Sequence, residues 1–144
     1  MTEFISKSVK DTENFGERVA RALPSPGVIA LYGDLGSGKT AFTRGFVRGL
    51  GLVAEVHSPT FTFCNDYSDE KVGVYHFDMY RISSEDDLYS IGFYDYLEEG
   101  AYIIIEWSEN IDELLPSDSI KIKITKNENE NDRIFKMNGC DLAL

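Results

Sequence analysis

The residues from Gly33 to Thr40 carry the clearest chemical signal in the sequence. They read Gly-Asp-Leu-Gly-Ser-Gly-Lys-Thr and match the phosphate-binding pattern Gly-x-x-x-x-Gly-Lys-[Ser/Thr], the Walker A motif, at every fixed position. Glycines let the backbone curl until successive N–H groups face a phosphate. Lys39 would place its ammonium on the β- and γ-phosphates, and the Thr40 hydroxyl would reach Mg²⁺. We expect nucleotide contacts from Gly33, Asp34, Leu35, Gly36, Ser37, Gly38, Lys39, Thr40 and Ala41.

Two acids downstream of this loop, Asp78 and Glu106, each end a segment with β character. An apolar strand that ends in a carboxylate is typical of a Walker B element, in which the acid reaches Mg²⁺ or its water. Either acid could hold a Mg²⁺ beside Thr40, directly or through water. Either could instead accept hydrogen bonds in the loop that follows its strand. We therefore name Lys39, Asp78 and Glu106 as candidate catalytic residues and Thr40, Asp78 and Glu106 as candidate metal ligands.

Five further residues have weaker signals. Ser58 and Thr60 lie in a segment where a hydroxyl could sense the γ-phosphate, although spacing alone favours an ordinary Ser-Pro turn. Arg81 is either a charge stabiliser for phosphoryl transfer or half of a surface ion pair. His76 is better explained as a strand residue with a satisfied partner than as a base. Trp107, the single tryptophan, either packs in the core or contacts the nucleotide or a partner.

The elements that position these residues follow from apolar patterning. Gly27–Tyr32 is a short apolar run that predicts a buried strand before the loop. Apolar residues recur at helical spacing after Lys39, and Gly51 stands where a helix C-cap is expected. Ala101–Trp107 is a continuous apolar run and predicts a central parallel strand covered on both faces.

The remaining pattern completes an α/β fold. Further strands are expected at Glu3–Val9, Val56–Phe63, Lys71–Asp78, Ser119–Thr125 and Arg133–Met137, and helices at Asp11–Leu23, Ser83–Leu88, Tyr94–Glu99 and Ser108–Leu115. Asp11 and Thr12 are candidate N-caps of the first helix. We predict one P-loop NTPase-like domain over residues 1–144, a three-layer sandwich with a mainly parallel central sheet. Val56–Phe63 and the C-terminal hairpin are expected to supply antiparallel edge strands.

Composition narrows the possible partners. The formal net charge is −11, which argues against binding of nucleic acid by this chain alone, because such affinity comes largely from Lys and Arg. A partly basic protein partner fits better. Cys64 and Cys140 form no metal-binding spacing and are expected to be free thiols in a reducing cytoplasm. Neither a signal peptide nor a membrane span is evident, so we expect a cytoplasmic protein without membrane contact.

Several motifs together resemble those of the TsaE (YjeE) family of small bacterial P-loop ATPases. The motifs stand, in the order seen in that family, at Gly33–Thr40, Ser58–Phe61, His76–Arg81 and Ile105–Trp107. The resemblance extends from about Phe4 to Lys123, and the His-x-Asp-x-Tyr-Arg and Glu-Trp patterns are more specific than the phosphate loop. The family usually has proline after Glu-Trp, where this chain has Ser108. The hairpin from Asn127 onward matches no motif.

This resemblance implies a function. TsaE proteins serve in making N6-threonylcarbamoyladenosine at position 37 of tRNA, with ATP and Mg²⁺ as cofactors and TsaD and TsaB as partners. Contact with tRNA is then expected only indirectly, through the complex. Carried over by position, Lys39 and Thr40 bind phosphates and Mg²⁺, and Glu106 is the second metal-linked carboxylate. Asp78 resembles the catalytic or water-positioning acid and Thr60 the switch residue, whereas Trp107 matches a residue needed for function.

Three functions are therefore weighed. The first is an ATPase that is slow alone and stimulated by the TsaD–TsaB transferase complex. The second is a small P-loop kinase acting on a metabolite, although such kinases usually need a lid and several arginines at the site. The third is an adaptor that binds ATP without hydrolysing it. The base is not readable from the residues, because Thr125-Lys126-Asn127-Glu128 only resembles the guanine-reading Asn-Lys-x-Asp motif.

Overall fold

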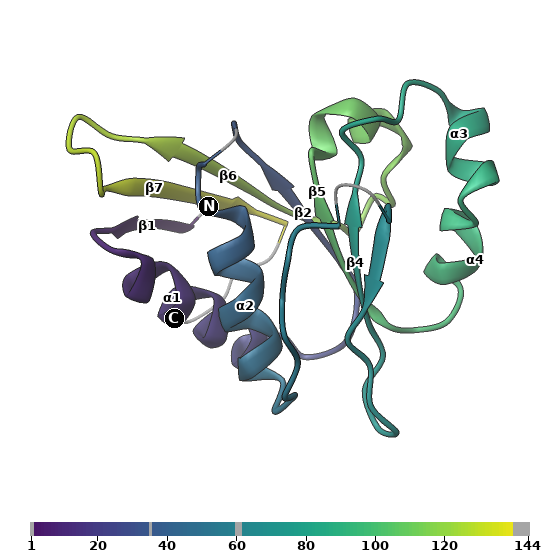
Figure 1. Ribbon diagram of the computed structural model, residues 1–144, viewed down its shortest axis with the longest axis horizontal. Helices are drawn as coiled ribbons and strands as arrows, with labels where there is room; N and C mark the ends of the chain where they lie inside the picture. Colours follow the sequence, from purple (N-terminus) through teal and green to yellow (C-terminus); the bar gives the residue numbers. More distant parts are fainter. Residues whose placement is uncertain (1, 35, 60–61, 140–144) are drawn as a thin grey trace.

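A seven-stranded sheet crosses the middle of the molecule, in a computed structural model that describes residues 2–34, 36–59 and 62–139 (Figure 1). Its strands are β1 (Thr2–Ser6), β2 (Val28–Tyr32), β3 (Cys64–Asp66), β4 (Val74–Asp78), β5 (Tyr102–Glu106), β6 (Ile120–Lys126) and β7 (Arg133–Asn138). The order across the sheet is β1-β7-β6-β2-β5-β4-β3. The central four strands are parallel, and β1, β7 and β3 pair antiparallel with their neighbours. The predicted mainly parallel sheet with antiparallel edges is confirmed.

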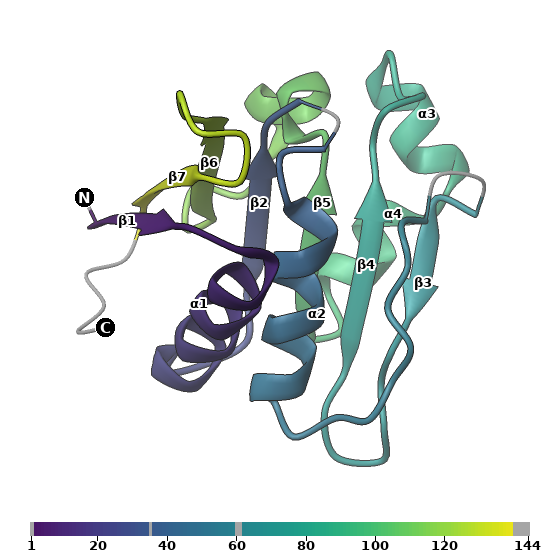
Figure 2. The ribbon, with the colours of Figure 1, turned by 60° about the vertical axis from the view of Figure 1, so that its left-hand side comes forward.

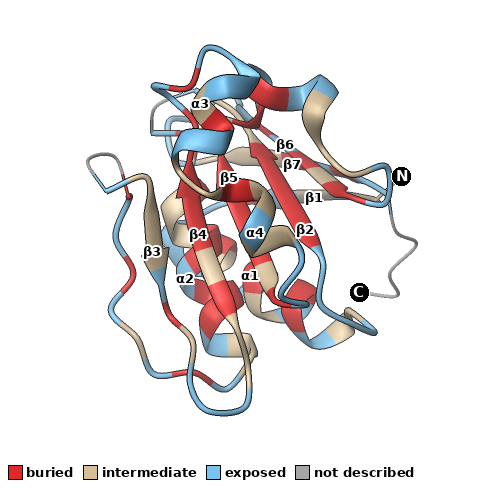
Figure 3. Cartoon of the chain, turned by 90° about the vertical axis from the view of Figure 1, so that its right-hand side faces the viewer, coloured by how far each residue is buried: buried red, intermediate tan, exposed pale blue. Residues whose placement is uncertain are grey.

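Helices cover both faces of this sheet. On one face lie α1 (Val9–Ala22) and α2 (Lys39–Gly49); on the other lie α3 (Glu85–Ser90), α4 (Phe93–Leu97) and the 3₁₀ helix η1 (Ser108–Leu114) (Figures 1 and 2). The central strands are buried along most of their length (Figure 3). Apolar side chains on both sides of β5 explain why its sequence is a continuous apolar run. The predicted three-layer α/β sandwich is therefore correct.

Two separate cores fill the spaces between the layers. The core under α1 and α2 is rich in aromatic rings, with Phe15 and Phe135 5.1 Å apart between centroids. The core under α3, α4 and η1 includes Phe77 and Phe93, which pack edge to face at 5.2 Å. Side chains alternate along β4, so Val74 lies in the first core and Phe77 in the second. The sheet thus holds the strand ends rigidly from both sides.

The segment from 56 to 63 differs from the sequence prediction. Val56–Phe63 was expected to form an edge strand, but in the structure the chain has no regular structure over residues 52–59, and the edge strand is β3. The Phe63 N–H donates to the Pro59 carbonyl at 3.0 Å, and Phe63 has a φ of 62°. Proline also lacks the N–H that a ladder needs. The backbone therefore turns before it pairs with β4. Thr60 and Phe61 lie outside the described residues.

The N-terminus also differs in detail. β1 ends at Ser6, and Ser8 caps α1 by accepting a hydrogen bond from the Asp11 N–H at 3.0 Å. The predicted caps Asp11 and Thr12 are therefore wrong, because the helix begins one turn earlier. β1 also lies outside β7, so the C-terminal hairpin is not the sheet edge, and its first strand, β6, runs parallel to β2.

The two cysteines and the membrane prediction have simple outcomes. Cys64 is a free thiol, and burial raises its pKa to about 12. Cys140 falls outside the described part of the chain. Among the helices that the structure describes, none is long and apolar enough to cross a membrane.

Close approach of α1 and α2 depends on glycines at their contact. A Cβ added to Gly45 would lie 1.8 Å from the carbonyl oxygen of Glu13, and one added to Gly16 would lie 2.2 Å from that of Phe42. Only backbone without a side chain fits at these positions. Ion pairs between the helices, such as Arg44 with Glu13 at 2.8 Å, lie on the exposed side of this contact.

We predict that Gly45→Ala lowers the free energy of unfolding by about 2 kcal/mol, because the helices must separate to admit the methyl group. Chemical denaturation followed by circular dichroism measures this change. Gly27→Ala is the control, since nothing lies within 4 Å of a Cβ at Gly27. Equal stability of the two variants would show that the helix contact tolerates a side chain.

Candidate functional site

The loop between β2 and α2 forms the floor of the site. Gly38, the N-cap of α2, has a φ of 109°, and Gly33 has a φ of 152°. A Cβ on Gly33 would also lie 2.7 Å from the carbonyl oxygen of Ile124 and 2.8 Å from the Ser37 Oγ. Side chains at these two positions would disrupt the loop, so the spacing of the motif reflects real backbone constraints. Leu35 lies outside the described residues.

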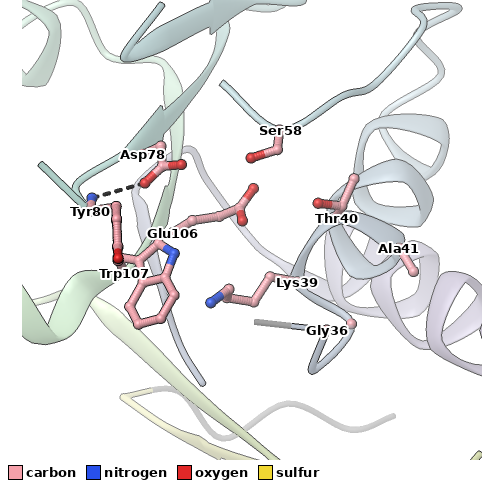
Figure 4. A pocket seen from close by; sticks show the side chains of 10 residues that line it. Gly36, Lys39, Thr40, Ala41, Ser58, Asp78, Tyr80, Glu106 and Trp107 are labelled. Carbon is pink, nitrogen blue, oxygen red and sulfur yellow. Dashed lines mark hydrogen bonds between the residues drawn. The ribbon is translucent and has the colours of Figure 1, made fainter. Parts of the chain in front are cut away.

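A cavity of about 510 Å³ opens above this loop (Figure 4). It gathers side chains from the loop, from the start of α2, from the segment before β3, and from the ends of β4 and β5. Its lining residues are Gly36, Gly38, Lys39, Thr40, Ala41, Ser58, Asp78, Tyr80, Glu106 and Trp107. The structure therefore brings together the residues that the sequence predicted separately at the loop, at the two acidic strand ends and at Trp107.

Asp78 and Glu106 stand side by side because their strands are parallel neighbours. The two residues are register partners at the carboxyl ends of β4 and β5, and their exposures are 4% and 3%. Oδ1 of Asp78 accepts the Tyr80 N–H at 2.8 Å, and Oε2 of Glu106 is 2.6 Å from Nε2 of His76. Figure 4 shows both carboxylates directed into the cavity, on the side where the Thr40 hydroxyl lies. Two acids that end neighbouring parallel strands therefore meet at the same edge of the sheet.

Lys39 lies between the loop and the indole of Trp107. Its Nζ donates to the Gly33 carbonyl and lies 3.9 Å from the centroid of the Trp107 ring. Burial lowers the pKa of Lys39 below its ordinary value of 10.5, and the nearby carboxylates, with Glu106 the strongest, act in the opposite direction. The cavity thus holds a desolvated ammonium whose interaction with an added anion is stronger than it would be in bulk water.

Trp107 owes its position to an unusual backbone conformation. It follows Glu106 directly and has a φ of 57°, which costs about 1–3 kcal/mol for a residue other than glycine. Two hydrogen bonds support the turn, from the Asn110 N–H to the Trp107 carbonyl at 3.2 Å and from the Ser108 Oγ to the Ile105 carbonyl at 3.0 Å. The turn directs the indole over Lys39. Ser108, where the resembling family has proline, is buried and stabilises this turn.

The other predicted site residues have mixed positions. Asp34, Ser37 and Gly33 border a second cavity beside β6 instead of the first. The Ser37 Oγ is buried and has no hydrogen-bond partner among the described residues. Thr60 lies outside the described residues. His76 is a satisfied strand residue, as the sequence favoured, since its ring contacts Tyr67 and Glu106.

Three contacts to the site were missed by sequence reasoning. Glu109 accepts the Gly33 N–H at 3.0 Å, and Arg133 donates to the Gly36 carbonyl at 3.1 Å. Tyr80 lines the cavity and packs on Trp107, with ring centroids 5.0 Å apart. Only Tyr80 had a signal, its place in the His-x-Asp-x-Tyr-Arg pattern. Arg133 comes from the hairpin that matched no motif.

The donor set decides which metal could bind here. No group of three or more His, Cys, Asp or Glu residues that could hold a metal occurs in the described ranges. Sites built wholly from protein ligands, such as structural zinc sites, are therefore not found in this part of the chain. A hydroxyl with one or two carboxylates, completed by water and substrate phosphates, is instead the set that Mg²⁺ uses. Thr40, Asp78 and Glu106 fit that description.

The comparisons with known proteins all point to the same family. The model of the family described as "Threonylcarbamoyl adenosine biosynthesis protein TsaE" matches residues 6–135. Among proteins called "tRNA threonylcarbamoyladenosine biosynthesis protein TsaE", that of Bacillus subtilis is 40% identical over 110 residues, covering 76% of this chain and 68% of the relative. That of Rickettsia prowazekii is 39% identical over 134 residues, covering 91% and 92%. That of Treponema pallidum is 36% identical over 120 residues, covering 83% and 88%.

A solved structure is also similar. The crystal structure of Bacillus subtilis YdiB has a TM-score of 0.75 and 29% identity, covering 93% of this chain and 82% of that one. The similarity therefore extends over nearly all of the sheet and its helices. It agrees with the α/β architecture described above.

The contact between Lys39 and Trp107 leads to a pH-dependent prediction. Trp107 is the single tryptophan, so its emission reports this contact. We expect the emission to change with a midpoint below pH 10.5, as Lys39 loses its proton. Lys39→Met is the matched variant, because methionine has an unbranched side chain of similar length but carries no charge. Tyrosine ionisation affects the emission of both proteins alike. Identical profiles of emission against pH for the two proteins would therefore contradict the contact between Lys39 and Trp107.

Proposed function

The chain belongs to the TsaE family of threonylcarbamoyl adenosine biosynthesis proteins, and from this we propose that it binds ATP and Mg²⁺ and hydrolyses ATP in support of tRNA modification. One observation carries the proposal. A single cavity combines a phosphate-binding loop, through Lys39 and Thr40, with two adjacent buried carboxylates, Asp78 and Glu106. Phosphoryl transfer depends mainly on positioning and electrostatic stabilisation, and this combination supplies both.

Binding of the triphosphate uses the loop and the start of α2. The N–H groups there carry partial positive charge toward the cavity, which favours an anion. The Lys39 ammonium, bonded to the Gly33 carbonyl, would exchange that partner for phosphate oxygens. Because Lys39 is largely buried, little water must be removed from it when the phosphate arrives. ATP, rather than another nucleotide, follows from the family and not from any base-reading residue.

The carboxylates would divide two tasks. Thr40 and Glu106 would hold Mg²⁺, which neutralises charge on the phosphates when bound. Asp78 would orient a water molecule toward the γ-phosphorus. The water oxygen then bonds to that phosphorus while the bond to the β–γ bridging oxygen breaks, releasing ADP and phosphate. The proton from water leaves on the phosphate product. The register pairing of Asp78 with Glu106 supports this arrangement, because it holds the two acids at a fixed separation.

Partner dependence follows from the positions of the arginines. Arg44 and Arg48 pair with Glu13 and Glu17 on the exposed sides of α1 and α2. Within the described part of the chain, no arginine lines the cavity. An arginine supplied by a partner raises such rates by about 10³- to 10⁵-fold in other systems. We propose that TsaD and TsaB form the partner complex, that tRNA is met only through it, and that this takes place in the cytoplasm.

A small kinase remains the alternative. It would use the same loop but must also bind a second, acceptor substrate, usually through several arginines. Lys39 is the one cation among the described lining residues, which favours hydrolysis over transfer to a metabolite. An adaptor that binds ATP without turnover would need no second carboxylate near Thr40. The lining therefore offers less than a kinase needs and more than an adaptor needs.

We predict slow phosphate release from ATP and Mg²⁺ by the chain alone, and release at least about tenfold faster with purified TsaD and TsaB. Glu106→Ala should lose the stimulated rate, because a carboxylate at the metal is removed. Glu99→Ala is the matched control, since Glu99 is exposed, contacts the Tyr75 hydroxyl and does not line the cavity.

Three outcomes separate the candidates. Stimulation that Glu106→Ala abolishes and Glu99→Ala preserves supports the ATPase. ATP binding without phosphate release, even with both partners, would replace the proposal with the adaptor. ADP formed without free phosphate would indicate that a small molecule accepts the phosphoryl group.

A further inference from the structure

A buried chain of hydrogen bonds extends from Glu106 away from the cavity. Oε2 of Glu106 is 2.6 Å from Nε2 of His76, and Nδ1 of His76 is 3.0 Å from the Tyr67 hydroxyl. That hydroxyl is also 3.1 Å from the carbonyl oxygen of His57. Asn65 completes the group, because its Nδ2 lies 3.0 Å from the same carbonyl and 3.4 Å from the Tyr67 hydroxyl. His76 is fully buried and Tyr67 is 8% exposed.

The orientation of the Asn65 amide fixes the direction of the donors. A carbonyl oxygen only accepts, so the Asn65 amide atom 3.0 Å from the His57 carbonyl is the nitrogen, and Oδ1 accepts from the Thr62 hydroxyl at 3.0 Å. The two N–H groups of that nitrogen then serve the His57 carbonyl and the Tyr67 oxygen. The carbonyl of His57 can only accept, so the Tyr67 O–H donates to it at 3.1 Å. The Tyr67 oxygen thus stands between that carbonyl and Nδ1 of His76.

The Tyr67 hydroxyl joins the His76 ring to the segment 52–59. Its oxygen is 3.0 Å from Nδ1 of His76 and 3.1 Å from the carbonyl oxygen of His57. Burial raises the pKa of Tyr67 above its ordinary value of 10.0, so the proton stays on the hydroxyl. The His57 carbonyl belongs to the segment 52–59, whose next residue, Ser58, lines the cavity. A shift of that carbonyl would therefore displace the hydroxyl relative to the His76 ring.

We propose that Tyr67 and His76 are positioning residues, which couple the segment 52–59 to the orientation of the Glu106 carboxylate through this hydrogen-bond chain. The His76 ring holds Oε2 of Glu106 at 2.6 Å, and the Tyr67 hydroxyl links that ring to the His57 carbonyl. The consequence for turnover rests on the proposed function, whereas the hydrogen-bond chain does not.

The contact between Tyr67 and the His76 ring can be measured directly in the nucleotide-free protein. The chain has two histidines, so ¹⁵N spectra of the imidazole rings are assigned with His57→Gln, which leaves the His57 backbone carbonyl in place. In Tyr67→Phe the ¹⁵N shifts of the His76 ring should change, because Nδ1 has lost its hydrogen-bond partner.

Tyr75→Phe is the matched control. Tyr75 stands next to His76 on the opposite face of β4, and its hydroxyl bonds to Glu99 at 3.2 Å. The variant loses one tyrosine hydroxyl, as Tyr67→Phe does, but should leave the His76 signals unchanged. His76 signals that are insensitive to Tyr67→Phe would overturn the proposal.

Kinetics then test the coupling to the reaction. Tyr67→Phe should lower the kcat for ATP hydrolysis roughly tenfold with little change in KM, because residues that orient a metal-site ligand have effects of that size. Thermal unfolding of each variant checks that the fold is kept. An unchanged kcat in a folded Tyr67→Phe would overturn the coupling. If the wild type does not hydrolyse ATP, the ATPase proposal fails, and the ring spectra still decide the hydrogen-bond chain.

Discussion

Burial of charged groups at one end of the sheet is the constraint on which the structure depends. Asp78, Glu106 and Lys39 are each at most 5% exposed, and a buried charge is costly unless it is paired and hydrogen-bonded. Each has a partner supplied by a neighbouring element. Glu106 contacts His76, Asp78 accepts the Tyr80 N–H, and Lys39 donates to Gly33. The opposite charges also favour one another, which offsets part of the cost of burying them.

The fold keeps these groups in place from several directions. Parallel pairing of β4 with β5 sets the two acids side by side, and the glycine contact between α1 and α2 fixes the helix that begins with Lys39. The loop itself is held by contacts from distant parts of the chain, Glu109 in η1 and Arg133 in β7. Such pre-positioned groups need little rearrangement when an anion arrives. The cavity is therefore a property of the whole sheet and not of the glycine loop alone.

Local patterns predicted the parts of the site that local chemistry determines. The loop from Gly33 to Thr40 and the acids at the ends of β4 and β5 were readable, because spacing and apolar runs are features of contiguous sequence. Tyr67, Glu109 and Arg133 were not readable, because their roles arise only when separate elements pack together. The strand expected at Val56–Phe63 was wrong for a related reason. Its β-rich composition was outweighed by Pro59 and by the positive φ of Phe63.

Calorimetric titration of ATP with and without Mg²⁺ tests the central claim most directly, namely that the buried acids complete a metal–nucleotide site. The account predicts that Mg²⁺ strengthens ATP binding in the wild type. It predicts that Glu106→Gln loses most of this strengthening while keeping the metal-free affinity, because Lys39 and the loop are untouched. Equal dependence on Mg²⁺ in the two proteins would contradict the claim and leave the acids with a purely structural role.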